Sequence, residues 1–174
     1  LDITNKNLVI RVDMNVPIQN GIVTDTSRIR ACIPTIKLAL ENNAKVLLIS
    51  HLGRPEEGKF EEKFSMKPVA KSLSSILNEE VGLIDRLDSE EIFKSSLSIQ
   101  ILENIRFFKG EKANDKDLGN TLANLGDIYV FDAFGTAHRE QASTHSAIEQ
   151  SKIACAGLLL EREIDFLTKA LNDY

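Results

Sequence analysis

The chain alternates between short apolar runs and longer segments whose hydrophobic residues recur every three or four positions. The clearest apolar run, residues 46–50 (VLLIS), predicts a strand that is buried on both faces of a sheet. Residues 27–42 instead place Ile29 and Ile36 on one side of a predicted helix, which Pro34 bends or delays. By the same patterns we expect further strands at 8–12, 81–84, 98–103, 127–131 and 153–157. Further helices are expected at 67–78, 88–95 and 114–125, from about 136 onward, and from 158 to about 171.

Strands and helices that alternate at this spacing are typical of βαβ units. The right-handed crossover between parallel strands then favours an α/β fold with a mainly parallel sheet covered by helices. In such a sheet the carboxyl ends of the strands meet at one edge, and ligands bind there. Polar residues that directly follow the predicted strands are therefore the first candidates for a functional site.

Composition limits the partners that such a domain would take. The 174 residues are 43% hydrophobic and carry a net charge of −5, with an isoelectric point near 5.3. This balance argues against nucleic acid or an anionic membrane as the main partner. Because no apolar run reaches about 18 residues and no basic-then-apolar leader begins the chain, we expect a soluble, cytoplasmic protein. Cys32 and Cys155 stand alone in apolar surroundings and are predicted to be buried, reduced thiols.

Cations gather at the predicted strand ends, against the acidic balance of the whole chain. Several guanidinium groups in one cleft repel each other unless an anion lies among them, and arginine binds carboxylate and phosphate by paired hydrogen bonds. A small, multiply anionic ligand such as a phosphorylated acid is therefore expected, with Asp13 and Asn15 placed to hold a hydroxyl group. The residues predicted to share this edge are Asp13, Asn15, Arg28, His51, Arg54, Arg106, His138 and Arg139.

Each of these residues taken alone has a simpler interpretation. Arg28 lies in the first turn of its predicted helix, where the dipole disfavours a cation, and is either a solvated surface residue or a contact to a bound anion. His51 alone is more typical of a hydrogen-bonded structural histidine, and Asp13 of a strand-end cap. Arg106 precedes Phe107 and can stack on an aromatic ring. Only their convergence favours a binding site.

Several other classes of site lack their motifs. No GxGxxG follows the first predicted strand and no GxxxxGK[ST] occurs, so neither a dinucleotide nor a P-loop site is supported. A nicotinamide-dependent oxidoreductase is disfavoured for the same reason. GxSxG is missing and the histidines do not have the spacing of metal ligands. A stand-alone module that binds anions without chemistry remains an alternative to an enzyme.

Four motifs carry a resemblance to a known family. They are RVDMNVP at 11–17, SHLGRP at 50–55, LENIRF at 102–107 and DAFGTAHR at 132–139, followed by AST at 142–144. In this order and spacing the chain resembles the amino-terminal half of phosphoglycerate kinase. Two positions depart from the usual pattern: Phe131 stands where asparagine is common, and Met14 where phenylalanine is common.

The resemblance implies a three-layer αβα, Rossmann-like domain that is one of two in a hinged glycolytic enzyme. That enzyme transfers a phosphoryl group between 1,3-bisphosphoglycerate and ADP, or between 3-phosphoglycerate and ATP in reverse. The implied partners are the phosphoglycerate and a missing carboxyl-terminal domain that binds Mg-ATP or Mg-ADP, so no cofactor or metal site is expected in this chain. The complete enzyme is expected to be a monomer, and the isolated chain to be inactive.

The resemblance also implies the division of the chain and the role of each site residue. Residues 1–157 are expected to form the phosphoglycerate-binding domain, and 158–174 the start of an interdomain helix. Arg28 is the implied catalytic residue, which stabilises the transferring phosphoryl group. The implied substrate-binding residues are Asp13, Met14, Asn15, Arg28, His51, Leu52, Gly53, Arg54, Arg106, His138 and Arg139.

Overall fold

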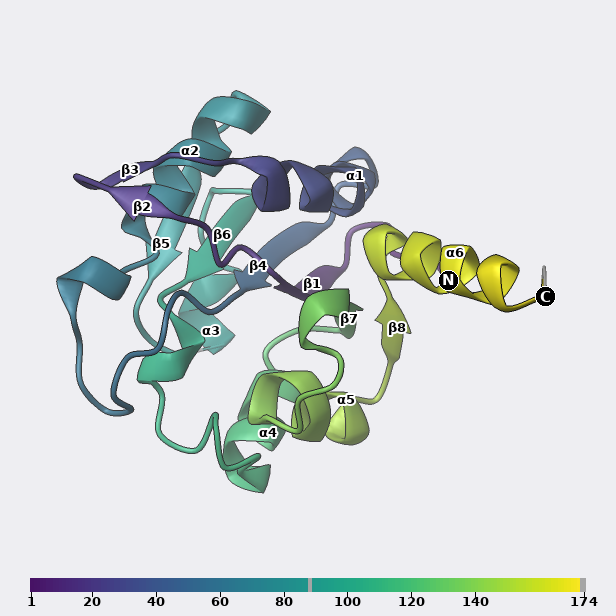
Figure 1. The fold of residues 1–174 in the computed structure, drawn as a ribbon. Helices are drawn as coiled ribbons and strands as arrows, with labels where there is room; N and C mark the ends of the chain where they lie inside the picture. The colour runs from purple at the N-terminus through teal and green to yellow at the C-terminus, as the bar shows by residue number, and fades with distance from the viewer. Residues whose placement is uncertain (88, 173–174) are drawn as a thin grey trace.

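The computed structural model describes residues 1–87 and 89–172 (Figure 1). Its centre is a six-stranded sheet in the order β5-β6-β4-β1-β7-β8, in which every neighbouring pair is parallel. The predicted parallel sheet is thus confirmed, and the strand ends differ from the predicted ones by only one or two residues. The strands are β1 (Asn7–Val12), β4 (Lys45–Ile49), β5 (Val81–Ile84), β6 (Ile99–Leu102), β7 (Ile128–Asp132) and β8 (Ala154–Ala156).

Helices cover both faces of this sheet, which confirms the three-layer α/β fold (Figure 1). One face carries α1 (Ser27–Glu41) and α2 (Lys67–Leu77). The other carries α3 (Ser89–Ile92), α4 (Lys116–Ala123) and α5 (Ala147–Gln150). The last helix, α6 (Leu158–Asn172), packs against α1. Residue 88, at which the third predicted helix was expected to begin, lies outside the described residues.

Strand alternation explains how one chain builds two cores. In β1 the side chains of Leu8 and Ile10 enter the core beneath α1 and α2, whereas Val9 enters the core beneath α4 and α5. Because both faces are covered, the strand is almost entirely buried, as its apolar sequence predicts. Arg11 lies in the same strand and is also fully buried, which requires polar partners inside the protein.

Local side chains set the beginnings of the main helices. Asp25 Oδ1 accepts the backbone N–H of Ser27 at 2.8 Å where α1 begins, and the helix continues through Pro34. A later start at this proline is therefore wrong. The fourth helix begins after Asp115, whose carboxylate accepts the N–H of Leu118 at 2.8 Å.

Short elements replace some of the predicted loops and turns. The turn at Asn20 and Gly21 has positive φ at both residues (51° and 72°), and it closes a small antiparallel hairpin of β2 (Ile18–Gln19) and β3 (Ile22–Val23). The charged segment 56–64 ends in a 3₁₀ turn at Glu62–Phe64, and another at Ile105–Phe107 follows β6.

The helix expected from about residue 136 is wrong. A 3₁₀ turn at Phe134–Thr136 is followed by a turn and irregular chain at 137–141, then by a π-helical turn at Ala142–Ser146 and only then by α5. The reason is a distant carboxylate: Glu111 accepts hydrogen bonds from both the backbone N–H and the hydroxyl of Ser143. These donors are bound outside the segment, and the local sequence pattern does not contain that information.

Candidate functional site

Four adjacent strands, β6, β4, β1 and β7, carry the polar loops of the predicted site to one edge of the sheet (Figure 1). All four are parallel, so the loops that follow them leave the sheet on the same side. The outer strands β5 and β8 carry none of the predicted site residues. The strand order therefore brings loops together that are far apart in the sequence.

A buried asparagine joins two of these loops. Asn104 Oδ1 accepts the backbone N–H groups of Leu52 and Arg106, and its Nδ2 donates to the carbonyls of Leu52 and Phe64. Gly53 follows with φ of 59°, and a Cβ at this position would overlap the Phe64 ring. The hydrogen bonds of Asn104 and the contact between Gly53 and Phe64 thus hold the loop after β4 in one conformation.

Asp13 organises the loop after β1. Its Oδ2 forms an ion pair with Arg28 Nη1 at 2.7 Å, and its Oδ1 accepts the N–H of Asn15 at 3.2 Å. The Asn15 side chain accepts the N–H of Gly53 at 2.9 Å and so joins this loop to the next. The Arg28 side chain is 55% exposed although it is paired. It is therefore neither a purely solvated residue nor one locked inside the fold.

His51 is buried among arginines. Its side chain is buried, with Nδ1 3.4 Å from Arg11 Nη2. Burial, and after it the charges of nearby guanidinium groups, of which Arg11 and Arg106 contribute most, lower the pKa of His51 to about 2. The ring is therefore neutral at physiological pH and acts as a hydrogen-bonding group rather than a cation.

Two further arginines leave hydrogen-bonding capacity unused. Burial, and then the charge of Arg139, lowers the pKa of Arg106, whose Nη1 donates to the Gly53 carbonyl. Within the described part of the chain, the buried Nε atoms of Arg106 and Arg139 have no hydrogen-bond partner. Buried donors of this kind are rare unless a ligand, ion or water satisfies them. An anion between these side chains would supply both the acceptor and the missing charge.

The remaining predicted site residues are placed differently. Arg54 is exposed but lies close enough to Arg106 to affect its pKa. His138 is exposed on the loop after β7, and within residues 1–87 and 89–172 it forms no hydrogen bond or ion pair with the others. Met14 and Leu52 are buried in the core, so they can serve the edge only through their backbone.

Arg11 is a member of this cluster that the predicted contact set omits. It is fully buried, and it donates to the Ser143 hydroxyl at 2.8 Å and to the Val12 carbonyl. The signal in the sequence was a single charge inside an apolar strand, which is costly unless it is paired.

Comparisons with known proteins agree with this geometry. The family profile described as phosphoglycerate kinase matches residues 1–174. The chain belongs to the phosphoglycerate kinase family. The phosphoglycerate kinases of Desulfovibrio desulfuricans and Nitratidesulfovibrio vulgaris are 48% and 50% identical to it over 173 residues. The resemblance carried by the four motifs is thereby confirmed over the whole chain.

Solved structures of the family share the fold. Phosphoglycerate kinase from Coxiella burnetii superposes with a TM-score of 0.89 at 46% identity, over 98% of this chain and 43% of that one. The enzyme from Pyrococcus horikoshii OT3 gives a TM-score of 0.84 at 31% identity, over 98% of this chain and 44% of that one. The two bacterial relatives are likewise matched over 99% of this chain but 44% of their own length. The chain thus spans less than half the length of the phosphoglycerate kinases it matches, and corresponds to their amino-terminal part.

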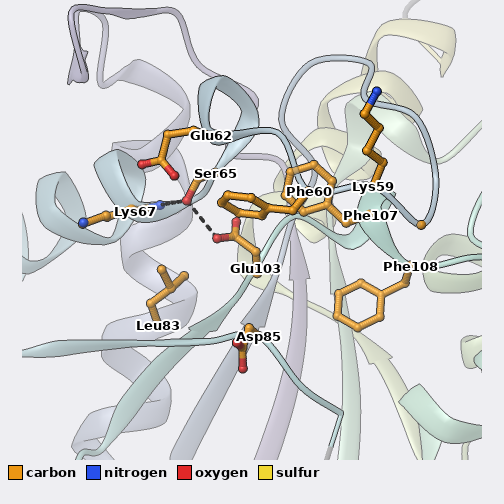
Figure 2. Close-up of a pocket in the computed structure, with 11 residues that line it drawn as sticks. Lys59, Phe60, Glu62, Ser65, Lys67, Leu83, Asp85, Glu103, Phe107 and Phe108 are labelled. Carbon is orange, nitrogen blue, oxygen red and sulfur yellow. Dashed lines mark hydrogen bonds between the residues drawn. The ribbon is translucent and has the colours of Figure 1, made fainter.

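One cavity lies away from the arginines of the edge. It measures about 700 Å³ and is walled by Phe60, Phe107 and Phe108, with Ser65 donating to the buried carboxylate of Glu103 (Figure 2). Arg28 and Asp13 instead line a smaller hollow of about 260 Å³ that α6 closes on one side. Residues 1–87 and 89–172 contain no cluster of three or more metal-ligating side chains. They also contain no helix long and apolar enough to span a bilayer.

Proposed function

We propose that this chain is the phosphoglycerate-binding part of a phosphoglycerate kinase. In the complete enzyme it would act with a nucleotide-binding part to transfer a phosphoryl group between 1,3-bisphosphoglycerate and ADP. The observation that carries the proposal is the pair of buried Nε donors on Arg106 and Arg139, which have no partner among the described residues. They lie at an edge rich in guanidinium groups, and a phosphorylated carboxylic acid offers both acceptors and compensating negative charge.

The other predicted contacts fit different parts of the same ligand. Asp13 and Asn15 present polar side chains to the edge, suited to the hydroxyl of a glycerate. His51 is neutral and offers hydrogen bonding without adding to the repulsion between the arginines. Arg54 and His138 are exposed and supply the outer side of the site. Met14, Leu52 and Gly53 contribute through their backbone.

Arg28 is the proposed catalytic residue. Its side chain is 55% exposed and that of Asp13 is 16% exposed, so solvent screens their ion pair from the Arg28 side and limits its worth to about 1 kcal/mol. The guanidinium group can therefore leave Asp13 at small cost and turn toward a phosphoryl group in transfer. Phosphoryl transfer depends mainly on positioning and on neutralising charge in the transition state, which is what a mobile arginine at this edge supplies.

The nucleotide belongs to the other part of the enzyme in this proposal. Mg-ATP or Mg-ADP would supply or accept the phosphoryl group there, and this chain would then be inactive alone. Residues 1–157 would form the phosphoglycerate domain and 158–174 the start of the interdomain helix. We further propose that the complete enzyme is a cytoplasmic monomer.

Calorimetric titration of the chain with 3-phosphoglycerate, glycerate and inorganic phosphate tests the proposal. We expect 3-phosphoglycerate to bind at least tenfold more tightly than either smaller anion, because each smaller anion meets only part of the edge. Equal affinity for phosphate would make the chain a general anion-binding module instead. A folded chain that binds none of the three would contradict the proposal.

A further inference from the structure

A buried chain of hydrogen bonds lies beneath the basic edge, the side of the sheet that carries Arg28, Arg54, Arg106 and Arg139. It includes three residues outside the predicted contact set. Arg11 Nε donates to the Ser143 hydroxyl at 2.8 Å. That hydroxyl lies 2.6 Å from Glu111 Oε1, and the Ser143 backbone N–H donates to Glu111 Oε2 at 2.9 Å. The three residues are fully buried. Arg11 thus reaches a buried carboxylate through one hydroxyl group.

The donor and acceptor groups determine the direction of each hydrogen bond. A guanidinium group only donates and a carboxylate only accepts, so the Ser143 hydroxyl must accept from Arg11 and donate to Glu111. The other end of Arg11 obeys the same rule: Nη2 lies 3.4 Å from His51 Nδ1, so Nδ1 is the acceptor. Burial and the surrounding guanidinium groups lower the pKa of His51, which keeps the ring neutral. A neutral ring that accepts at Nδ1 carries its proton on Nε2.

We propose that Glu111 and Ser143 are positioning residues: they orient Arg11, and Arg11 holds His51 as the Nε2–H tautomer that donates a hydrogen bond to the bound anion. The tautomer is a property of the chain without ligand. Its use for the phosphoglycerate rests on the proposed function.

The surrounding fold supports a fixed rather than an incidental arrangement. The Tyr129 hydroxyl donates to the Ser143 carbonyl at 2.7 Å, so both backbone groups and the side chain of Ser143 are engaged. Ser143 lies in the π-helical turn at Ala142–Ser146, which presents its N–H and its hydroxyl to one carboxylate. Burial raises the pKa of Glu111 overall, and Arg11 and the two hydrogen bonds from Ser143 offset part of that rise by favouring the ionised form.

The same turn offers a matched control. Ser146 is also buried, and its hydroxyl hydrogen-bonds to Asn114 but not to Arg11. Removing it leaves a comparable gap in the same turn without breaking the path from Glu111 to His51. Glu111→Gln is the complementary change, since it keeps the shape of the side chain but puts a donor into a site built for an acceptor.

The decisive measurement is the ring ¹⁵N spectrum of His51 in the unliganded chain. We expect the native chain and Ser146→Ala to show the Nε2–H tautomer. Ser143→Ala and Glu111→Gln should move both ring nitrogens toward the averaged shifts of two exchanging tautomers. A native ring protonated on Nδ1 would overturn the proposal, as would an unchanged spectrum in both network variants.

Affinity for 3-phosphoglycerate then tests the consequence for binding. We expect Ser143→Ala to bind about three- to tenfold more weakly than the native chain, and Ser146→Ala to bind as the native chain does. Equal loss in both variants would reduce Ser143 to a packing residue and overturn its positioning role. If the native chain binds no phosphoglycerate, the proposed function fails, while the ring spectrum still decides whether the network sets the tautomer.

Discussion

The aromatic cavity and the basic edge differ in whether their buried polar groups have hydrogen-bond partners within the protein, and their volumes do not reflect this difference. The cavity is the larger, about 700 Å³ against about 260 Å³ for the hollow beside Arg28. Its buried carboxylate, Glu103, accepts hydrogen bonds from the backbone N–H groups of Met66 and Asn104. It also accepts one from the Ser65 hydroxyl (Figure 2). At the edge, by contrast, buried donors of Arg106 and Arg139 lack protein partners among the described residues.

The Glu103 network at the cavity and the arginines of the basic edge therefore have different roles. A buried polar group whose hydrogen bonds are all made within the protein stabilises the fold, and its removal leaves its partners unsatisfied. A buried charge without partners costs stability and is retained for something outside the chain. Substitutions in the hydrogen-bond network of Glu103 should therefore change the free energy of unfolding, whereas substitutions at the edge should change binding and turnover.

The largest effect is expected for Arg28→Ala in a complete phosphoglycerate kinase that carries this chain as its amino-terminal part. We expect kcat to fall by about 10²- to 10³-fold, because a charge that stabilises the transition state is lost. The free energy of unfolding should change by about 1 kcal/mol or less, since the Arg28 side chain is 55% exposed and solvent screens its pair with Asp13. Steady-state kinetics and urea denaturation give the two values, with Arg30→Ala on the same helix as the control. Parallel loss of turnover and stability would remove the catalytic role.

On the cavity side, Glu103→Ala should destabilise the chain strongly. Three buried donors lose their acceptor, which predicts a loss of about 2–4 kcal/mol in the free energy of unfolding. Urea denaturation measures this value. Glu62→Ala, an exposed carboxylate that lines the same cavity, should change the free energy of unfolding by less than about 0.5 kcal/mol. Equal effects of the two substitutions would contradict the structural role of the Glu103 network.

Arg139→Ala tests whether a substitution at the basic edge changes ligand binding without lowering the free energy of unfolding. We expect affinity for 3-phosphoglycerate to fall about 10- to 100-fold, because a charge-assisted hydrogen bond is lost. The free energy of unfolding should stay constant or rise, since a buried donor without a protein partner and its repulsion of Arg106 are removed. Calorimetry and denaturation of the same sample test both halves. If the variant is destabilised but binds 3-phosphoglycerate with native affinity, Arg139 stabilises the fold and does not bind the ligand.

The smallest effect concerns pH and His51. Its pKa is lowered to about 2 in the folded chain, against about 6.5 when unfolded. The unfolded state then binds the proton more readily, so this residue makes stability fall as the pH drops below about 6.5. Between pH 6.5 and 5 the native chain should lose about 1–2 kcal/mol more than His51→Gln, as measured by urea denaturation. Identical pH slopes would show that the ring protonates freely in the folded state.

The sheet could be predicted because its signal is local. Apolar runs fixed the position of β4 and β5 to within a residue or two, and the alternation of elements indicated the parallel order. The collection of arginines at one edge followed from that order. Arg54 was found in this way, as a polar residue that follows a predicted strand, and Arg28 as a cation in the first turn of a predicted helix.

The parts that sequence reasoning missed depend on distant partners. Arg11 was visible as a charge in an apolar strand, but nothing in the sequence connected it to Ser143. Glu111 lies before the predicted helix at 114–125 and was not a candidate residue, although its carboxylate is buried and accepts two hydrogen bonds from Ser143. The incorrect helix from about residue 136 has the same origin, because tertiary hydrogen bonds replaced helical ones there.

The most direct test of the account is an amide NMR titration of this chain with 3-phosphoglycerate, beside a separate titration with Mg-ATP. We predict that 3-phosphoglycerate shifts the amide resonances around the basic edge, at Asn15, His51, Gly53, Arg106 and Arg139. The amide resonances around the cavity, at Phe60 and Leu83, should not shift. Mg-ATP should shift neither set. Shifts centred on the cavity with an unchanged basic edge would contradict the central claim, and so would a folded chain that does not respond to 3-phosphoglycerate.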